Sequence, residues 1–92
     1  MNESECDRFI SNLRQRYEEA YPQSGAAHAR ASAVLVDGIS HGARTFAPYP
    51  FHITKAEGAY VHDVDGHRIC DYWQGHYANI LGHNPPVVRG KL

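Results

Sequence analysis

The chain has 92 residues, with nine Lys and Arg against ten Asp and Glu, and a formal net charge of −1 at pH 7. This length allows at most one small domain, and the near-neutral charge gives no support for nucleic acid or an anionic membrane surface as a partner. No apolar run approaches the ~20 residues that a bilayer span needs, and residues 1–20 are too charged for a signal peptide.

The first twenty residues have the pattern of an amphipathic helix. Apolar side chains recur with the i, i+3, i+4, i+7 spacing of one helical face, at Cys6, Phe9, Ile10, Leu13, Tyr17 and Ala20. Asn2 or Ser4 could cap the start of this helix, and Pro22 is expected to end it. An alanine-rich run predicts a second, shorter helix over residues 26–35, closed by Asp37-Gly38 as a glycine C-cap.

Residues 38–50 lack a clear period and contain two glycines and two prolines, which predicts an irregular loop. Arg44 lies in this loop with no carboxylate close to it in the sequence. Such a guanidinium is either a surface charge or a fixed fork for a carboxylate or phosphate, and composition alone favours the surface charge.

Three short runs, residues 51–55, 59–64 and 67–72, predict a three-stranded antiparallel meander. Glu57-Gly58 is a turn candidate between the first two runs. Asp65-Gly66 separates the last two, and this pair is typical of a type I′ hairpin turn, in which both central residues have positive φ. Residues 74–83 are rich in aromatic, His and Asn residues and predict a loop, and a helix is expected to begin near Pro86.

No recognised metal or catalytic motif is present. Potential metal ligands lie within twenty-two residues, at His62, His67, Cys70, His76 and His83, but their spacing matches no zinc motif. No nucleotide-binding glycine motif or Gly-x-Ser-x-Gly sequence occurs. We therefore expect no metal site and no catalytic residue within the chain.

The two cysteines, Cys6 and Cys70, are far apart and show no motif spacing. Two buried thiols in a reducing compartment are a better interpretation than a disulfide. The expected location is the cytoplasm.

An ordered series of short motifs resembles the N-terminal region of the class III, fold-type-I aminotransferases, which depend on pyridoxal phosphate (PLP). Within that class the chain most resembles glutamate-1-semialdehyde aminomutase and related amino-acid aminotransferases. The motifs are Gly38-Ile39 with Arg44, Ala56-Glu57-Gly58-Ala59, Asp63-Val64-Asp65-Gly66, Ile69-Cys70-Asp71-Tyr72 and Ile80-Leu81-Gly82-His83.

The resemblance implies an α+β fragment of an α/β fold: N-terminal helices in residues 1–37, a substrate-side loop in 38–50, an antiparallel meander with a pocket loop in 51–83, and the start of a helix in 84–92. It places Arg44 where the family holds a substrate carboxylate, and His76 where the family lines the substrate pocket. Trp73 and Tyr77 are further pocket candidates. Asp63, Gly66 and Gly82 match positions that shape a turn or a close backbone approach.

The family's Schiff-base lysine and phosphate cradle match nothing in the chain, because neither Lys55 nor Lys91 fits the lysine motif. We therefore expect either a fragment or a truncated gene product that does not bind PLP tightly by itself. Its partners would be the rest of an aminotransferase chain, a second subunit and a small amino substrate. An open alternative is a small non-catalytic interaction module that docks through residues 73–77.

Overall fold

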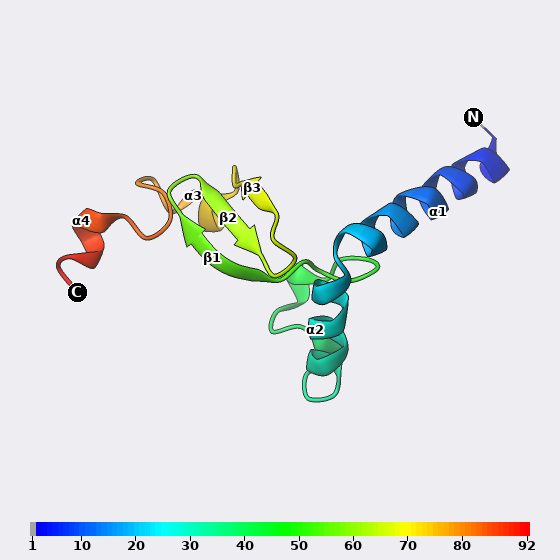
Figure 1. Cartoon of the computed structure of the whole chain (residues 1–92), viewed down its shortest axis with the longest axis horizontal. Coiled ribbons are helices and arrows are strands. Elements are labelled where there is room, and N and C mark those ends of the chain that lie inside the picture. The colour runs from blue at the N-terminus through cyan, green and yellow to red at the C-terminus, as the bar shows by residue number, and fades with distance from the viewer. Residues whose placement is uncertain (1) are drawn as a thin grey trace. The chain divides into compact units, whose positions relative to one another are not determined.

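The computed structural model describes residues 2–92 as two compact units, one ending at Phe51 and one beginning at His52 (Figure 1). The first unit contains α1 (Glu3–Ala20), α2 (Pro22–Ser32) and two 3₁₀ turns, η1 (Val36–Gly38) and η2 (Gly42–Arg44). The second contains β1 (Ile53–Glu57), β2 (Tyr60–Asp63), β3 (Arg68–Cys70), α3 (Gln74–Tyr77) and α4 (Pro86–Arg89). This order confirms an α+β chain with N-terminal helices, a meander and a helix beginning at Pro86.

A capping box defines the start of α1. The Glu5 amide donates to Asn2 Oδ1 over 2.9 Å, and the Asn2 amide donates back to Glu5 Oε2 over 2.9 Å. Two amide groups that the helix itself leaves unpaired are thus satisfied reciprocally. Asn2, and not Ser4, is therefore the cap.

The second helix begins earlier than its alanine-rich run suggests. Pro22 occupies the first turn of α2 and starts the helix, so the expectation that the second helix begins at residue 26 was wrong. Proline suits this position, because the N–H that it lacks has no partner in the first turn of a helix. The expected glycine cap was also wrong: α2 ends at Ser32, and Asp37 (φ 54°) and Gly38 (φ 68°) turn the chain afterwards, in η1.

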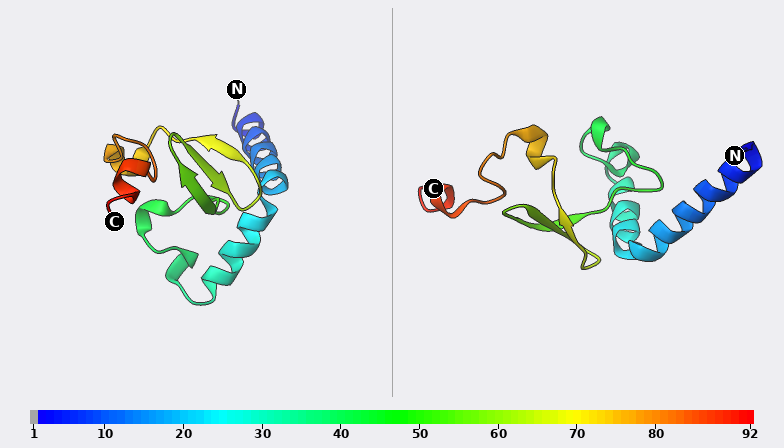
Figure 2. Two further views of the ribbon diagram at one scale, coloured as in Figure 1. Left: turned by 60° about the vertical axis from the view of Figure 1, so that its left-hand side comes forward. Right: turned by 90° about the horizontal axis from the view of Figure 1, so that it is seen from above.

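An aromatic cluster holds the first unit together. The ring of Tyr17 lies 4.5 Å from Tyr21, 5.5 Å from Tyr49 and 5.7 Å from Phe46, centroid to centroid. The Tyr17 hydroxyl also donates to the Tyr49 carbonyl over 2.9 Å. These contacts join the loop after η2 to α1, whose other turns stand clear of α2 (Figure 2).

The second unit is built on a sheet of order β1-β2-β3 with antiparallel neighbours, as the three runs predicted (Figure 1). The turn between β2 and β3 differs from the expected type I′. Gly66 has φ 89° and its amide donates to the Asp63 carbonyl over 3.3 Å, while Asp65 is not among the described residues with positive φ. A three-residue hairpin loop that ends in one left-handed glycine requires positive φ only at that glycine.

Little of the chain is buried within these units. Among the described residues Val61 is the one buried apolar side chain, and Ser24 and Asp63 are buried polar ones. Cys6 and Cys70 are free and exposed, so the expectation of buried thiols was wrong. Cys6 lies on a face of α1 that nothing described covers, and Cys70 ends a strand with one exposed face. None of the helices in the described part of the chain is both long and apolar enough to cross a membrane.

Candidate functional site

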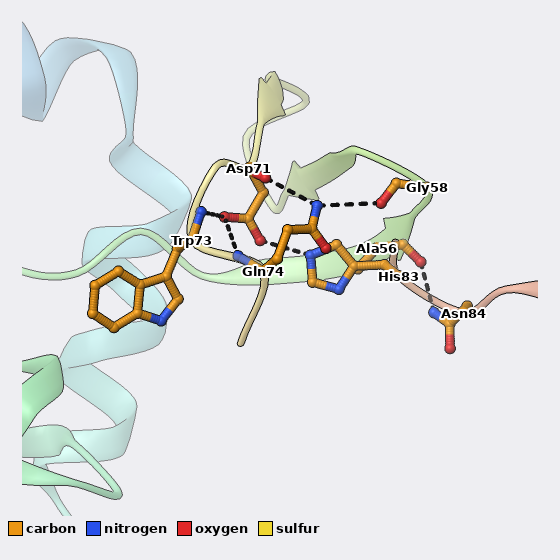
Figure 3. Close-up of polar contacts among 7 residues, drawn as sticks. All are labelled: Ala56, Gly58, Asp71, Trp73, Gln74, His83 and Asn84. Atoms are coloured by element: carbon orange, nitrogen blue, oxygen red, sulfur yellow. Dashed lines mark hydrogen bonds and ion pairs between the residues drawn. The ribbon is translucent and has the colours of Figure 1, made fainter. Parts of the chain in front are cut away.

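The carboxylate of Asp71 anchors the loop that follows β3 (Figure 3). One oxygen, Oδ1, accepts from the backbone amides of Trp73 over 2.8 Å and Gln74 over 3.2 Å. The other, Oδ2, lies 2.6 Å from Nε2 of His83 at the far end of the loop. A single side chain therefore holds both ends of residues 72–83.

Further hydrogen bonds tie this loop to the turn between β1 and β2. Gly58 and His83 exchange backbone hydrogen bonds of 2.9 and 2.8 Å, which form an isolated antiparallel bridge. Gln74 Nε2 donates to the carbonyl of Asp71 over 2.9 Å and reaches that of Gly58 at 3.5 Å. Asn84 Nδ2 donates to the Ala56 carbonyl over 2.6 Å. The loop is thus fixed to the sheet through backbone groups.

Gly82 permits the close approach between the loop and this turn. A Cβ atom at Gly82 would lie 2.9 Å from the Gly58 carbonyl oxygen and 3.0 Å from its carbon, and the φ of Gly82 is +79°. Only glycine meets both conditions without strain. The architectural role expected for Gly82 is confirmed, as is the turn at Gly66.

Two carboxylates in the second unit are held ionised by their histidine partners. The hydrogen bond from His83 lowers the pKa of Asp71 below its ordinary value, against the opposing effect of burial and with help from the Gln74 and Trp73 amides. Burial alone would raise the pKa of Asp63. The side chain and backbone amide of His67, each 2.7 Å from that carboxylate, outweigh burial and lower it.

Residues Gln74–Tyr77 form a left-handed turn. Their φ values are +47°, +59°, +60° and +63° in order, and the Tyr77 amide donates to the Trp73 carbonyl over 2.8 Å. Left-handed helical backbone costs roughly 1–2 kcal/mol for each non-glycine residue, and only Gly75 escapes this cost. Backbone of this kind persists where surrounding contacts impose it, and it is concentrated at functional sites.

The left-handed turn gathers three of the four side chains singled out in the sequence. The Trp73 ring lies edge-on to His76 with centroids 4.8 Å apart and tilts against Tyr77 at 5.5 Å. All three residues are exposed. In Figure 3 the Trp73 indole extends away from the polar contacts of Asp71. The result is an exposed aromatic group on a rigid loop, which we call the aromatic triad.

Arg44 belongs to the first unit. It ends η2, whose start is capped by His41: the Ala43 amide donates to His41 Nδ1 over 3.2 Å. Its side chain is exposed, and no ion pair of Arg44 is found within residues 2–92. The guanidinium is therefore available to a ligand.

A surface cavity of about 560 Å³ opens beside this segment, lined by His28, Ser32, Asp37, Ile39, Thr45, Phe46, Ala47, Pro48 and Pro50. His28 Nδ1 is buried without a hydrogen-bond partner. His28 lies in α2, and no motif in the sequence singles it out, because a histidine in an alanine-rich run is typical of an ordinary helix.

The chain's histidines and lysines do not form a metal centre or a PLP site. His67 and His83 each pair with an aspartate, and the described residues contain no group of three potential metal ligands. Lys55 is exposed and forms a 2.8 Å ion pair with Glu57, and Lys91 is exposed near the C-terminal end of the chain. A lysine that forms a covalent bond with PLP lies in a prebuilt, enclosed site, whereas both of these lysines are exposed. Lys55 and Lys91 therefore do not provide a binding site that fits PLP.

Comparison with known proteins identifies the relatives of the chain. No protein-family model matches it. A glutamate-1-semialdehyde 2,1-aminomutase of Methanopyrus kandleri is 42% identical over 72 residues, which cover 78% of this chain and 17% of that protein. A beta-phenylalanine transaminase of Variovorax paradoxus is 28% identical over 89 residues, which cover 97% of this chain and 20% of that protein. The chain thus spans about a fifth of the length of these curated relatives.

Solved structures agree with these sequence relationships. The beta-phenylalanine aminotransferase from Variovorax paradoxus superimposes with a TM-score of 0.87 at 28% identity, over 91% of this chain and 20% of that chain. A transaminase with PLP bound gives a TM-score of 0.72 at 35% identity, over 75% of this chain and 16% of that chain. The chain is therefore homologous to a segment of the class III, PLP-dependent aminotransferases and has the fold of that segment.

Proposed function

We propose that the chain is the N-terminal portion of a PLP-dependent aminotransferase or aminomutase that acts on an amino acid or an amino-aldehyde. In this role it contributes substrate-binding and dimer-interface residues, and the remainder of the enzyme supplies PLP, its lysine and the covalent chemistry. The names of its relatives support this reaction class, because they include an aminomutase and a transaminase.

The observation that carries the proposal is the left-handed turn of Gln74–Tyr77. The turn is strained, and the hydrogen bonds of Asp71 fix both ends of its loop to the sheet. A loop without a function is not expected to retain strained backbone, because substitution to glycine or a return to right-handed backbone relieves the strain. The proposed task is to hold His76, with Trp73 and Tyr77 beside it, at the wall of a substrate pocket.

Arg44 is proposed to bind the carboxylate of the substrate. Its exposed guanidinium can form two parallel charge-assisted hydrogen bonds to a carboxylate. A lysine at the same place would offer a point charge without this planar geometry. Arg44 is therefore proposed to provide the polar recognition of the substrate carboxylate.

A chimeric enzyme tests this function. The segment that matches this chain in the Methanopyrus kandleri aminomutase is exchanged for the corresponding residues of the chain, and aminomutase activity is measured. Activity above that of the host without the segment supports the proposal. A chimera that folds and binds PLP but whose activity is unchanged by His76→Ala and by Arg44→Ala would contradict it.

The alternative function is a non-catalytic interaction module, and the exposed aromatic triad is the observation that favours it. Exposed aromatic clusters are common anchors at protein interfaces. The isolated chain distinguishes the two functions. A partner captured by the wild-type chain but lost with Trp73→Ala, together with an inactive chimera, would favour the module.

A further inference from the structure

The outer face of the sheet in the second unit carries a row of basic side chains. In the antiparallel register Lys55 lies opposite His62, and His62 lies opposite Arg68. Because directly opposed residues of neighbouring strands project from the same face, these three side chains form one line across β1, β2 and β3 (Figure 1). We call them the basic row. Val61, which precedes His62, projects from the other face and is buried.

Pairing within the sheet does not explain the basic row. Opposite charges at directly opposed positions stabilise a sheet, but no acidic residue occupies any position of this row. The row is open to solvent, since Lys55 and Arg68 are exposed and His62 is half-buried. The chain as a whole has a formal net charge of −1, so an overall basic composition does not explain the row either.

An aromatic ring holds Arg68 in place. The central carbon of its guanidinium lies 3.8 Å from the centroid of the Tyr60 ring, a cation–π contact that restrains the group. Among the described residues this guanidinium has no hydrogen bond or ion pair. Its five N–H donors are therefore available, and because the side chain is already restrained, a ligand would lose less affinity to the ordering of Arg68.

Lys55 extends toward the same part of the face. Its Nζ lies 2.8 Å from Glu57 Oε2, and Glu57 is directly opposite Tyr60 in the sheet. The ammonium of Lys55 and the guanidinium of Arg68 therefore lie above neighbouring positions of β1 and β2. His62 stands between them in the row, and an imidazole has at least one N–H donor. Three side chains thus offer donors around one place on the sheet.

The charges around this place match a dianion. Lys55 lowers the pKa of Glu57 through its hydrogen bond and its charge, against the effect of burial. The charges of Arg89 and His62 add to this lowering, so both lie near the same carboxylate. Three permanent cations, Lys55, Arg68 and Arg89, thus accompany one carboxylate and leave two positive charges in excess. A phosphate monoester carries about −1.5 to −2 charges at pH 7 and three acceptor oxygens, whereas a carboxylate would neutralise only one of the two.

We propose that the basic row is a binding site for a phosphate dianion, either free phosphate or the phosphate group of a small ester. Arg68 forms two parallel charge-assisted hydrogen bonds to the phosphate oxygens, and Lys55 and His62 donate to the oxygen that remains. The site does not depend on the proposed enzymatic function, because it shares no residue with the aromatic triad or with η2. Since the row is open to solvent, its dissociation constant is expected to be about 1 mM.

Nuclear magnetic resonance of the chain, titrated with inorganic phosphate at constant pH and ionic strength, measures the binding. The Nε–H signal of Arg68 and the imidazole signals of His62 should shift and saturate, while the amide signals of α1 should not move. Acetate, a monoanion, should bind at least tenfold more weakly. Methyl phosphate identifies the source of the group: retained affinity indicates a phosphate ester, and lost affinity indicates free phosphate. A site that does not saturate by about 50 mM phosphate would overturn the proposal.

Two substitutions with opposite expected effects test the assignment. Arg68→Lys keeps the charge but loses the planar fork and its contact with Tyr60, and should raise the dissociation constant about tenfold. The matched control, Arg8→Lys in α1, should leave it unchanged. Glu57→Gln removes the carboxylate that competes for Lys55 and should tighten binding about threefold, a gain that loss of structure cannot produce. Equal affinities in Arg68→Lys and Arg8→Lys, or a Glu57→Gln variant that binds no more tightly than the wild type, would contradict the site.

Discussion

Asp71 Oδ2 and His83 Nε2 lie 2.6 Å apart and join two residues that are twelve positions apart in the sequence. Both side chains are largely shielded from solvent, with 18% of Asp71 and 17% of His83 exposed. The other oxygen of Asp71 accepts hydrogen bonds from the Trp73 and Gln74 amides near the start of the same loop. The carboxylate therefore closes the loop that carries the aromatic triad, and its loss should open the loop without unfolding the meander.

Asp71→Asn tests this closure. The substitution removes the negative charge from three hydrogen bonds, and hydrogen bonds to charged groups are each worth about 1.5–3 kcal/mol when well shielded. Partial exposure and the remaining amide contacts reduce this loss. We therefore expect the free energy needed to open the loop to fall by about 1–2 kcal/mol. Hydrogen exchange at the amides of Trp73 and Gln74 should accelerate roughly five- to thirtyfold.

The control for this measurement is Asp37→Asn. Asp37 is an exposed aspartate of the first unit, and asparagine tolerates its left-handed backbone. Exchange in the loop after β3 should not change in this variant. Unchanged exchange in Asp71→Asn as well would show that the carboxylate does not close the loop.

Acid should loosen the second unit. The pKa values of Asp63 and Asp71 are lower in the folded chain than the ordinary 3.8, so the folded state binds fewer protons than the unfolded state near pH 3–4. Their stabilising contribution is present above the unfolded pKa and is lost as the pH falls through the folded values. Trp73, the single tryptophan, reports on this loss by fluorescence. A fluorescence profile that stays flat from pH 6 to well below pH 3 would contradict the prediction.

Gly82→Ala and Gly66→Ala separate steric contact from backbone strain. Both glycines have positive φ, +79° and +89°, so alanine costs about 1–2 kcal/mol at either position. At Gly66 the added methyl group meets nothing, whereas at Gly82 it collides with the backbone of Gly58. Gly82→Ala should therefore be more destabilising by urea unfolding and should abolish the protection of the Gly58 and His83 amides. Equal losses of stability in Gly82→Ala and Gly66→Ala would show that the close contact between residue 82 and Gly58 does not contribute to the difference.

The sequence predicted those elements that local chemistry determines. The apolar spacing of α1, the alternation of the three strands and the proline that begins α4 each act over a few residues, and all three appear in the structure. Local rules also produced the errors. Proline is common both just after a helix and in the first turn of one, so Pro22 alone does not show where the second helix begins. Likewise, Asp-Gly occurs in both two-residue and three-residue hairpin loops, so it does not determine the turn type.

The candidate site depends on contacts between distant residues, which single-residue preferences do not reveal. Trp73, His76 and Tyr77 were singled out through the family resemblance, yet of Gln74–Tyr77 only Gly75 favours positive φ. The left-handed turn follows from the anchoring by Asp71, Gly58 and His83, which are separated by up to 25 positions. Asp71 and His83 each lay in a recognised motif, but nothing in either motif indicated that they pair.

His76→Gly and His76→Ala test whether the left-handed turn stores strain. Both variants lose the imidazole and its contact with Trp73, so their difference isolates the backbone. At φ +60° an alanine is strained by its Cβ atom, whereas a glycine is not. His76→Gly should therefore be more stable than His76→Ala by about 1 kcal/mol. The reverse order should hold at Ala78, where the φ of −81° is ordinary and Ala78→Gly should be destabilising. Thermal unfolding of the four chains provides the comparison, and His76→Ala matching or exceeding His76→Gly would rule out stored strain.

The last prediction concerns Arg44 in the active chimeric enzyme. If Arg44 binds the substrate carboxylate, Arg44→Lys retains the positive charge but loses the second of two parallel hydrogen bonds. A hydrogen bond to a charged group is worth about 1.5–3 kcal/mol, so kcat/KM for a carboxylate-bearing substrate should fall roughly ten- to a hundredfold. An amine substrate without the carboxylate should react almost as fast as with the unsubstituted chimera, because it never used the guanidinium. Lys55→Arg, which changes an exposed cation paired with Glu57, is the control and should leave both rates unchanged. Equal losses on both substrates would instead indicate general damage to the loop of η2, and no loss on either would mean that Arg44 is only a surface charge.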